Sequence, residues 1–349
     1  MRRVSTYLAL AASAVFGLAA CGGGSSGATT EPSGSGSASS VKVGLAYDIG
    51  GRGDQSFNDS AARGLDKAKS GFGVQAKELE ASQGETDAQK EERLRLLAQT
   101  GYNPVIAVGF AYATAAKKVA AEFPKTNFGI IDDASFQAAN VANLVFAENE
   151  GSFLVGSIAA QASKTGNIGF IGGVNTPLIQ KFEAGYIAGA KAVNPNIKVQ
   201  VKYLTEPPDF SGFGDPAKGT TAAQGLLDAG ADVIYAAAGG SGSGAFEAVA
   251  TKKGAWAIGV DSDQYLTAAA SVKPIILTSM IKSVDVAVNN MIKSAVDGKD
   301  LTGVQTFDLK ADGVGYSTSN PAVKPFTAKA DEFKQKIISG SITVPDKTS

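Results

Sequence analysis

The sequence contains no histidine and only one cysteine, Cys21. Without histidine the chain cannot form a Ser-His-Asp triad, a histidine general base or a His-ligated zinc site. Without a second cysteine it cannot form an internal disulfide or a Cys-rich zinc site. These absences exclude much of the common chemistry of hydrolases and metalloenzymes.

A large charge of either sign is also missing. The 32 lysine and arginine residues are balanced by 33 acidic residues, which gives a formal net charge of −1, and no basic block stands out. Because nucleic-acid binding depends on concentrated positive charge, we predict no nucleic-acid partner.

The N-terminal segment is apolar but too short to span a membrane. Arg2 and Arg3 precede an apolar run that ends in "LAAC", whose cysteine is Cys21. This order of charge and apolar residues is typical of a secretory signal. The ending resembles the lipobox of bacterial lipoproteins, in which the cysteine is lipidated and becomes the new N-terminus. We therefore predict that residues 1–21 are a lipoprotein signal peptide and that Cys21 anchors the protein at the extracytoplasmic face of the cell membrane.

A segment of low complexity separates this signal from the rest of the chain. Residues 22–40, "GGGSSGATTEPSGSGSASS", contain almost no apolar side chain with which to offset the entropy of ordering, so we predict a flexible tether. The chain from Val41 onward is long enough for two domains of roughly 150 residues each.

Beyond the tether, apolar strand-like runs alternate with amphipathic runs such as "DAQKEERLRLLAQTG". Such alternation predicts an α/β protein built from βαβ units, with parallel sheets covered by helices on both faces. The strand candidates are "VKVGLAY", "VQAKELE", "PVIAVGF", "NFGIIDD", "NLVFA", "NIGFIGG", "IKVQVKYL", "DVIYAAAGG", "WAIGVD", "PIILTSMI" and "GVQTFDL".

Two stretches share a plan. "VGLAYDIGG" precedes a helix that contains Phe57, and "IGFIGGVNTP" precedes a helix that contains Phe182. We interpret them as the opening units of two similar lobes.

Ligands of doubly wound sheets bind beyond the carboxyl ends of the strands, so the residues that come after each strand are candidate site residues. These positions hold carboxylates, glycines, aromatic residues and a lysine. Such a mixture favours a polar, ring-bearing small molecule over a bare ion. The residues concerned are Asp48, Phe110, Tyr112, Asp132, Asp133, Gly172, Gly173, 239–244, 261–263 and Lys282.

Phe57 and Phe182 are the candidate stacking residues. Each also lies on an apolar helical stripe, so each could instead be a core residue. If the lobes face one another, the two rings would hold one planar ring between them, and stacking on an aromatic side chain is worth ~1–3 kcal/mol per base. Asp48 and Asn58 offer a carboxylate and an amide for the edge of such a ring.

Polar candidates for ligand hydroxyls come after later strands. We expect Asp261, the first acid of "GVDSDQ", to accept from hydroxyls, and Lys282 to donate to them or to balance that carboxylate. In "IIDDAS" we assign Asp133 to the ligand and Asp132 to structure. Neighbouring strand residues diverge and carboxylates alone are too few for a metal, so we predict no metal and no cofactor.

Two local motifs have simpler interpretations. Ser56 followed by Asp59 resembles a capping box at the start of a helix. The run "AAAGGSGSGAFEAV" lacks the Gly-Lys-Ser/Thr ending of a P-loop, so it predicts a tight strand-to-helix turn whose backbone amides could contact a ligand hydroxyl.

Together these motifs resemble the basic membrane protein family, also called the purine-nucleoside-receptor type of ABC transporter substrate-binding lipoprotein. The resemblance holds in the family's order over nearly the whole mature chain. It rests on "VGLAYDIGGRGDQSFNDSA", "NFGIIDD", "KFEAGYIAGAKAV", "AAAGGSGSGAFEAV", "IGVDSDQ" and "TSMIKSVD".

The resemblance implies a type I periplasmic-binding-protein fold in which two doubly wound lobes are joined by hinge crossings. It implies capture of a nucleoside, of the purine class, and its delivery to an ABC permease and its ATPase. We separately expect the protein to be a monomer. By motif position Phe57 and Phe182 would stack the base, and Asp48 and Asn58 would address its edge. The residues implied to hold the ribose are Asp133, Gly240, Asp261 and Lys282.

The expected chain crossings place residues 41–148 and 264–303 in the first lobe, and residues 149–263 and 304–349 in the second. One position departs from the family pattern, because Thr114 stands where many members have an aspartate. A contact from that loop could therefore differ and alter ligand preference.

Two other functions remain open on the sequence. The same fold could bind a sugar or another small polar metabolite, since pyranose binders also use aromatic faces. An extracellular nucleoside hydrolase would need a general acid and base or a metal near the glycosidic bond. Because the acids look arranged for hydroxyl binding, we predict that the protein is not an enzyme.

Overall fold

The computed structural model describes residues 39–348. The predicted signal peptide, its Cys21 and most of the predicted tether lie outside these residues. Within the described residues, no helix combines the length and apolar character needed to cross a bilayer.

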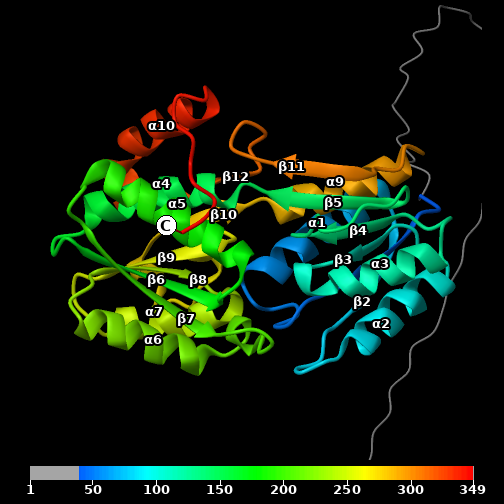
Figure 1. The fold of residues 1–349 in the computed structure, drawn as a ribbon, viewed down its shortest axis with the longest axis horizontal. Helices are drawn as coiled ribbons and strands as arrows, with labels where there is room; N and C mark the ends of the chain where they lie inside the picture. Colours follow the sequence, from blue (N-terminus) through cyan, green and yellow to red (C-terminus); the bar gives the residue numbers. More distant parts are fainter. Residues whose placement is uncertain (1–38, 349) are drawn as a thin grey trace, which may run out of the picture. The chain divides into compact units, whose positions relative to one another are not determined.

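The strands form two separate six-stranded sheets (Figure 1). The strands of the first sheet are β1 (Lys42–Ala46), β2 (Gln75–Leu79), β3 (Val105–Ala107), β4 (Phe128–Ile131), β5 (Val141–Phe146) and β11 (Gly303–Phe307). Those of the second are β6 (Asn167–Val174), β7 (Lys198–Thr205), β8 (Val233–Ala237), β9 (Trp256–Asp261), β10 (Ile276–Lys282) and β12 (Val314–Tyr316). All eleven predicted strands are confirmed, and the prediction missed the three-residue β12.

Helices cover both faces of each sheet. With the first sheet lie α1 (Phe57–Phe72), α2 (Asp87–Gln99), α3 (Ala113–Glu122) and α9 (Val284–Val296). With the second lie α4 (Glu148–Ala162), α5 (Pro177–Val193), α6 (Pro216–Asp228), α7 (Gly242–Ala250), α8 (Gln264–Thr267) and α10 (Lys324–Ile338). In Figure 1, α6 and α7 lie on one face of the second sheet, and α4 and α5 lie on the other. We call each sheet with its helices the first or the second lobe.

Both lobes have the same strand order. The order is β11-β5-β4-β3-β1-β2 in the first sheet and β12-β10-β9-β8-β6-β7 in the second. All neighbours are parallel except β12, which is antiparallel to β10. In each lobe the third strand is followed by a single 3-10 turn, η1 (Phe110–Tyr112) or η3 (Gly239–Ser241). The similar plan expected for the two lobes is therefore confirmed.

Central strands are buried because helices pack on both of their faces. All four residues of β4 and all five residues of β8 are buried. The edge strand β2 has no buried residue, which explains its polar sequence "QAKEL". Parallel sheets covered on both faces place every carboxyl strand end of a lobe along one edge, and this edge is where ligand residues can gather.

The chain passes between the lobes three times. It leaves β5 for α4, which packs on α5, and it returns from β10 to α9, which packs on α1. It passes again from β11 to β12. Sheet membership therefore differs from the predicted lobe boundaries: β10 pairs in the second sheet, whereas residues 264–303 were expected in the first lobe, and β11 pairs in the first. Strand pairing joins residues far apart in the sequence, so the local pattern did not reveal it.

Candidate functional site

One cavity collects residues from both lobes at the carboxyl ends of their strands. Its empty volume is about 550 Å³, a figure that includes open solvent at its mouth. The first lobe contributes Asp48, Ile49, Asp54, Phe57, Asn58, Phe110 and Asp132. The second contributes Leu178, Ile179, Phe182, Phe213, Ala237, Gly239, Val260, Asp261 and Lys282.

The two predicted stacking residues both line this cavity. Phe57 begins α1 and is half-buried, and Phe182 lies in α5 and is 3% exposed. The Lys282 ammonium lies 5.1 Å from the ring centroid of Phe57 and 5.5 Å from that of Phe182. The two rings therefore share one cation, which each ring face attracts through its quadrupole.

Lys282 is the centre of a buried cluster of charges. Its Nζ lies 2.6 Å from Asp132 Oδ2 and 3.2 Å from Glu148 Oε1, and all three side chains are at most 4% exposed. Burial raises the pKa of Asp132 to about 7, against the pull of Lys282 and with a contribution from Glu148. Among the described residues, Asp132 Oδ1 has no hydrogen-bond partner. This oxygen can accept from a ligand hydroxyl or hold a proton itself.

Asp261 is held by the opposite lobe. Ser56 Oγ donates to Asp261 Oδ2 at 2.6 Å, and Ser262 Oγ donates back to the Ser56 carbonyl at 2.7 Å. The predicted capping box is therefore wrong, because the Ser56 hydroxyl faces Asp261 and makes no cap hydrogen bond. Burial raises the pKa of Asp261, and the hydrogen bond from Ser56 opposes this rise. This charge-assisted bond between the lobes therefore stabilises the ionised carboxylate.

Asp132 and Asp261 occupy equivalent places in the two lobes. Asp132 comes directly after β4 and Asp261 ends β9, and these strands hold the same position in the two sheet orders. Both have a left-handed backbone, with φ of 69° and 63°. Left-handed backbone is costly for a residue with a Cβ, and such strain often marks functional sites.

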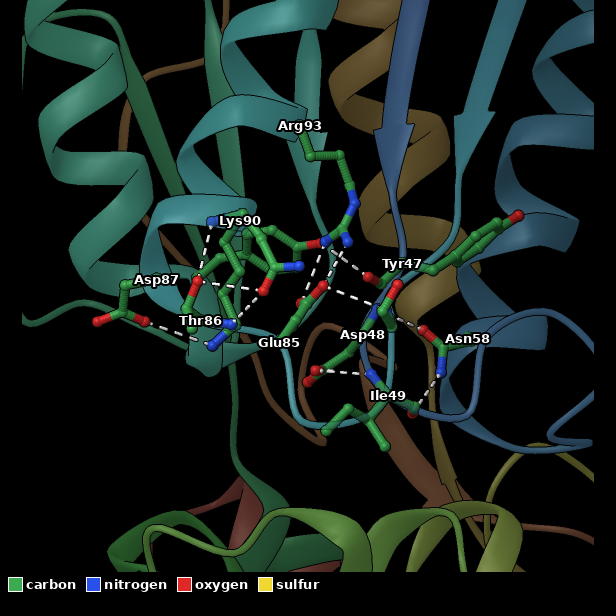
Figure 2. Close-up of polar contacts among 12 residues, drawn as sticks. Tyr47, Asp48, Ile49, Asn58, Glu85, Thr86, Asp87, Lys90 and Arg93 are labelled. Carbon is green, nitrogen blue, oxygen red and sulfur yellow. Dashed lines mark hydrogen bonds and ion pairs between the residues drawn. The ribbon is translucent and has the colours of Figure 1, made fainter.

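Asn58 positions acids instead of presenting a free amide. Its Oδ1 accepts from the Asp48 backbone N–H at 3.0 Å, and its Nδ2 donates to the Ile49 carbonyl at 3.3 Å and to Asp54 Oδ2 at 3.1 Å. Figure 2 shows the amide of Asn58 directed at the backbone of Asp48 and Ile49. Its hydrogen-bonding capacity is largely used within the protein, so its predicted contact with a ligand edge is not favoured by this geometry.

Asp54 takes the capping role that had been expected of Ser56 and Asp59. Its carboxylate accepts from the backbone N–H groups of Ser56, Asn58 and Asp59 at 2.8–3.1 Å. Burial nevertheless raises the pKa of Asp54 to about 6. Asp59 instead accepts from the N–H groups of the preceding loop.

A network of charged and polar side chains lies close to Asp48. Burial raises its pKa to about 6, although the N–H of Ile49 donates to Oδ1 at 2.8 Å and lowers it. Arg93 pairs with Glu85 next to it, as Figure 2 shows, and donates to the hydroxyl of Tyr112.

Gly109 provides space for the Asp48 carboxylate. Its φ is +109°, and a Cβ at this position would lie 2.3 Å from Asp48 Oδ2. We expect Gly109→Ala to lower the free energy of unfolding by about 1–3 kcal/mol, because the side chain forces both a strained backbone and a displaced carboxylate. Denaturant unfolding would measure this loss. Gly71→Ala is the control, because a Cβ at Gly71 meets nothing within 4 Å; equal losses for both variants would contradict the prediction.

The structure therefore brings together most of the predicted site residues. Six of them line the cavity: Asp48, Phe57, Asn58, Phe182, Asp261 and Lys282. Asp133 does not, because its Oδ1 accepts from the N–H and the hydroxyl of Ser135; Asp132, which had been assigned to structure, lines the cavity instead. Gly240 packs near Asp54 and the Phe213 carbonyl, and its neighbour Gly239 lines the cavity. Thr114 is exposed on α3.

Sequence reasoning missed several lining residues. Asp54 is one of them, although an acid two residues before Ser56 is itself a capping signal. Phe213 lies in η2 (Ser211–Phe213) after β7, and no local pattern marks it. Phe110 was named among the residues at strand ends, but no role was assigned to it.

Comparison with known proteins agrees with this geometry. Residues 41–348 match the family model described as "ABC transporter substrate-binding protein PnrA-like". The chain is 36% identical over 329 residues to the ABC transporter nucleoside-binding protein BmpA of Lactococcus lactis subsp. cremoris, which covers 88% of this chain and 90% of that protein. It is also 36% identical over 307 residues to an uncharacterized lipoprotein of Pyrococcus horikoshii, and this match covers 84% of this chain and 72% of that protein.

A solved structure agrees as well. An ABC transporter solute-binding protein from Aeropyrum pernix K1 has a TM-score of 0.78 and 29% identity, covering 88% of this chain and 94% of that one. The two α/β lobes thus have the predicted periplasmic-binding-protein fold.

Proposed function

Since the chain belongs to the PnrA-like family of ABC transporter substrate-binding proteins, we propose that it captures a purine nucleoside between its lobes and delivers it to an ABC importer. The observation that carries this proposal is one cavity whose lining includes the rings of Phe57 and Phe182, the carboxylates of Asp48, Asp132 and Asp261, and Lys282. Stacking suits a nucleobase, and the acids suit the hydroxyls of a pentose.

Each part of the cavity has a task in this proposal. Phe57 and Phe182 stack the base, and Asp48 accepts from the donors at its edge. Asp132 and Asp261, one from each lobe, accept from ribose hydroxyls, and the charge of Lys282 opposes the rise in pKa that burial causes in both acids. Because the hydroxyl acceptors come from both lobes, the ligand binds the closed form better than the open form and shifts the protein towards closure.

A purine is favoured over a pyrimidine because its larger face gains more from two rings. A nucleoside is favoured over a nucleotide because a phosphate would meet several carboxylates and only one lysine, which is already paired. The closed lobes would then be the form that the permease recognises.

The cellular setting of this proposal comes from the N-terminus. The lipobox predicts a protein that is lipidated on Cys21, anchored at the extracytoplasmic face of the cell membrane and separated from it by the tether of residues 22–40. The lipoprotein name of the Pyrococcus relative supports this anchor. We further propose a monomer with no catalytic activity.

Removing either stacking ring tests the proposal. We expect Phe57→Ala and Phe182→Ala each to weaken nucleoside binding by roughly 5- to 100-fold, since stacking on one side chain is worth ~1–3 kcal/mol. Isothermal titration with adenosine, guanosine, inosine, cytidine, ribose and glucose would measure it. Phe72→Ala is the control, because Phe72 ends the same helix as Phe57 and does not line the cavity.

Three results would contradict the proposal. A response to sugars alone would show that the protein is a sugar receptor. Unchanged nucleoside affinity in both ring variants would show that the base does not bind between the two rings. Release of hypoxanthine from inosine during incubation would make the protein a hydrolase.

A further inference from the structure

We propose that Phe110, Phe210 and Phe213 form an aromatic clasp that holds the two lobes closed over the cavity and sets how long a ligand stays bound. Only the part that concerns ligand residence rests on the proposed function. The effect on closure is independent of what the ligand is.

The clasp joins residues from different lobes around one central ring. Phe110 is the first residue of η1, which follows β3 of the first lobe. Phe210 and Phe213 belong to the segment between β7 and α6 of the second lobe. The ring centroid of Phe110 lies 5.8 Å from that of Phe210 and 6.5 Å from that of Phe213, at interplanar angles of 69° and 78°. These are the distances and the edge-to-face angles that aromatic pairs prefer.

The second-lobe side of the clasp is fixed to its own lobe. Ser241 Oγ donates to the Gly212 carbonyl at 2.7 Å and accepts from the Asp215 N–H at 2.8 Å. The ring of Phe213 also fills space left by Gly173, where a Cβ would lie 2.4 Å from Phe213 Cδ1. Residues 212–215 of this segment are therefore anchored to the second lobe, and opening of the lobes would separate Phe110 from both of its partners.

The three rings differ in their relation to the ligand cavity. Phe110 and Phe213 line it, whereas Phe210 lines an adjoining crevice that also contains Asp48 and Gln83. Phe210 can therefore stabilise closure without lining the ligand cavity. This difference makes Phe210 the informative position, because its removal changes closure without removing a wall of the ligand cavity.

The expected effect on lobe closure depends on whether the ring contact exists in the closed state alone. An edge-to-face pair that forms only in the closed state shifts the equilibrium towards that state by its own contribution, about two- to tenfold. The Phe110–Phe210 pair should therefore increase the closed population even without a ligand. Any ligand held by the closed lobes would leave more slowly by the same factor.

Interlobe distances test the clasp directly. The full chain with Cys21→Ser has no cysteine left, so Lys117→Cys and Glu247→Cys place one spin label on exposed positions of α3 and α7, one in each lobe. Pulsed electron paramagnetic resonance would then give the distance distribution without ligand. We expect Phe210→Ala to shift population from the short to the long distance by about two- to tenfold, and Phe210→Leu to have a smaller effect.

Nucleoside release gives the second readout. We expect Phe210→Ala to speed inosine dissociation in stopped flow by about two- to tenfold while the order of affinities among nucleosides stays the same. A double-mutant cycle with Phe110→Ala should show that the two effects are not additive. Phe123→Ala, at a half-buried ring that ends α3, should change neither readout.

The outcomes separate the two proposals. Unchanged interlobe distances in Phe210→Ala, or additive effects in the cycle, would overturn the clasp. If the unsubstituted chain binds no nucleoside, the proposed function fails, and the distances measured without ligand still decide whether the clasp exists.

Discussion

Lys282→Met is expected to lower the free energy of unfolding by about 3–5 kcal/mol near neutral pH, the usual cost of removing one partner from a buried ion pair. The Lys282 ammonium is 2% exposed and contacts the carboxylates of Asp132 and Glu148, which are just as buried. Methionine has a similar length and no charge, so it would leave these acids without a compensating cation. Denaturant unfolding of both proteins near pH 7.5 would measure the loss.

The pH dependence of this loss identifies its cause. Near pH 5 the Asp132 carboxyl, whose pKa burial raises to about 7, is largely protonated, so less negative charge remains to be compensated and the loss should shrink. Lys310→Met is the control, because Lys310 is exposed and has no ion pair among the described residues. A loss below about 1 kcal/mol, or one that is equal at both pH values, would contradict this account.

We expect the ligand-free protein to be more stable near pH 5 than near pH 7.5. Burial raises the pKa of Asp48 and Asp54 to about 6 and that of Asp132 to about 7, from ordinary values of 3.8. Between these limits the folded state binds more protons than the unfolded state, so stability is present at low pH and is lost as pH rises through the folded pKa values. Carboxyls with lowered pKa values, such as Glu332, act mainly below this window.

Asp132 should account for about 2–3 kcal/mol of the difference between these two pH values, since its pKa is shifted the most of the three. Asp132→Asn removes the titrating group, so its stability profile should be flatter by that amount. Asp133→Asn is the matched control, because the neighbouring acid does not line the cavity. Thermal or denaturant unfolding across the range would measure both. Parallel profiles for the Asp132→Asn protein and the unsubstituted chain would exclude this assignment.

Much of the fold could be predicted because the signals are local. Apolar runs of strand length and the amphipathic segments between them identify eleven strands and the parallel α/β class before any contact is known. The missed strand, β12, has only three residues and pairs antiparallel to β10. A segment of three residues is too short to show a hydrophobic period. Its pairing with β10 is what defines it as a strand.

The candidate site could be predicted in part for the same reason. Parallel strands end along one edge, so the positions of Asp48, Asp261 and Lys282 at the carboxyl ends of predicted strands were enough to identify them. The structure places Asp132 on the cavity and leaves Asp133 outside its lining, whereas the sequence prediction assumed a strand-like alternation past β4. The left-handed φ of Asp132 ends that alternation and turns its side chain towards Lys282.

The sequence by itself determined the class of the fold, the chemistry that the chain lacks and the edge of the sheets where polar and aromatic residues gather. The tertiary structure alone decided which sheet received β10 and β11, which acids meet across the lobes and which phenylalanines surround Phe110. The physical reason is that hydrophobic period and strand ends are properties of neighbouring residues, whereas strand pairing, burial of charge and ring contacts join residues that are distant in the chain.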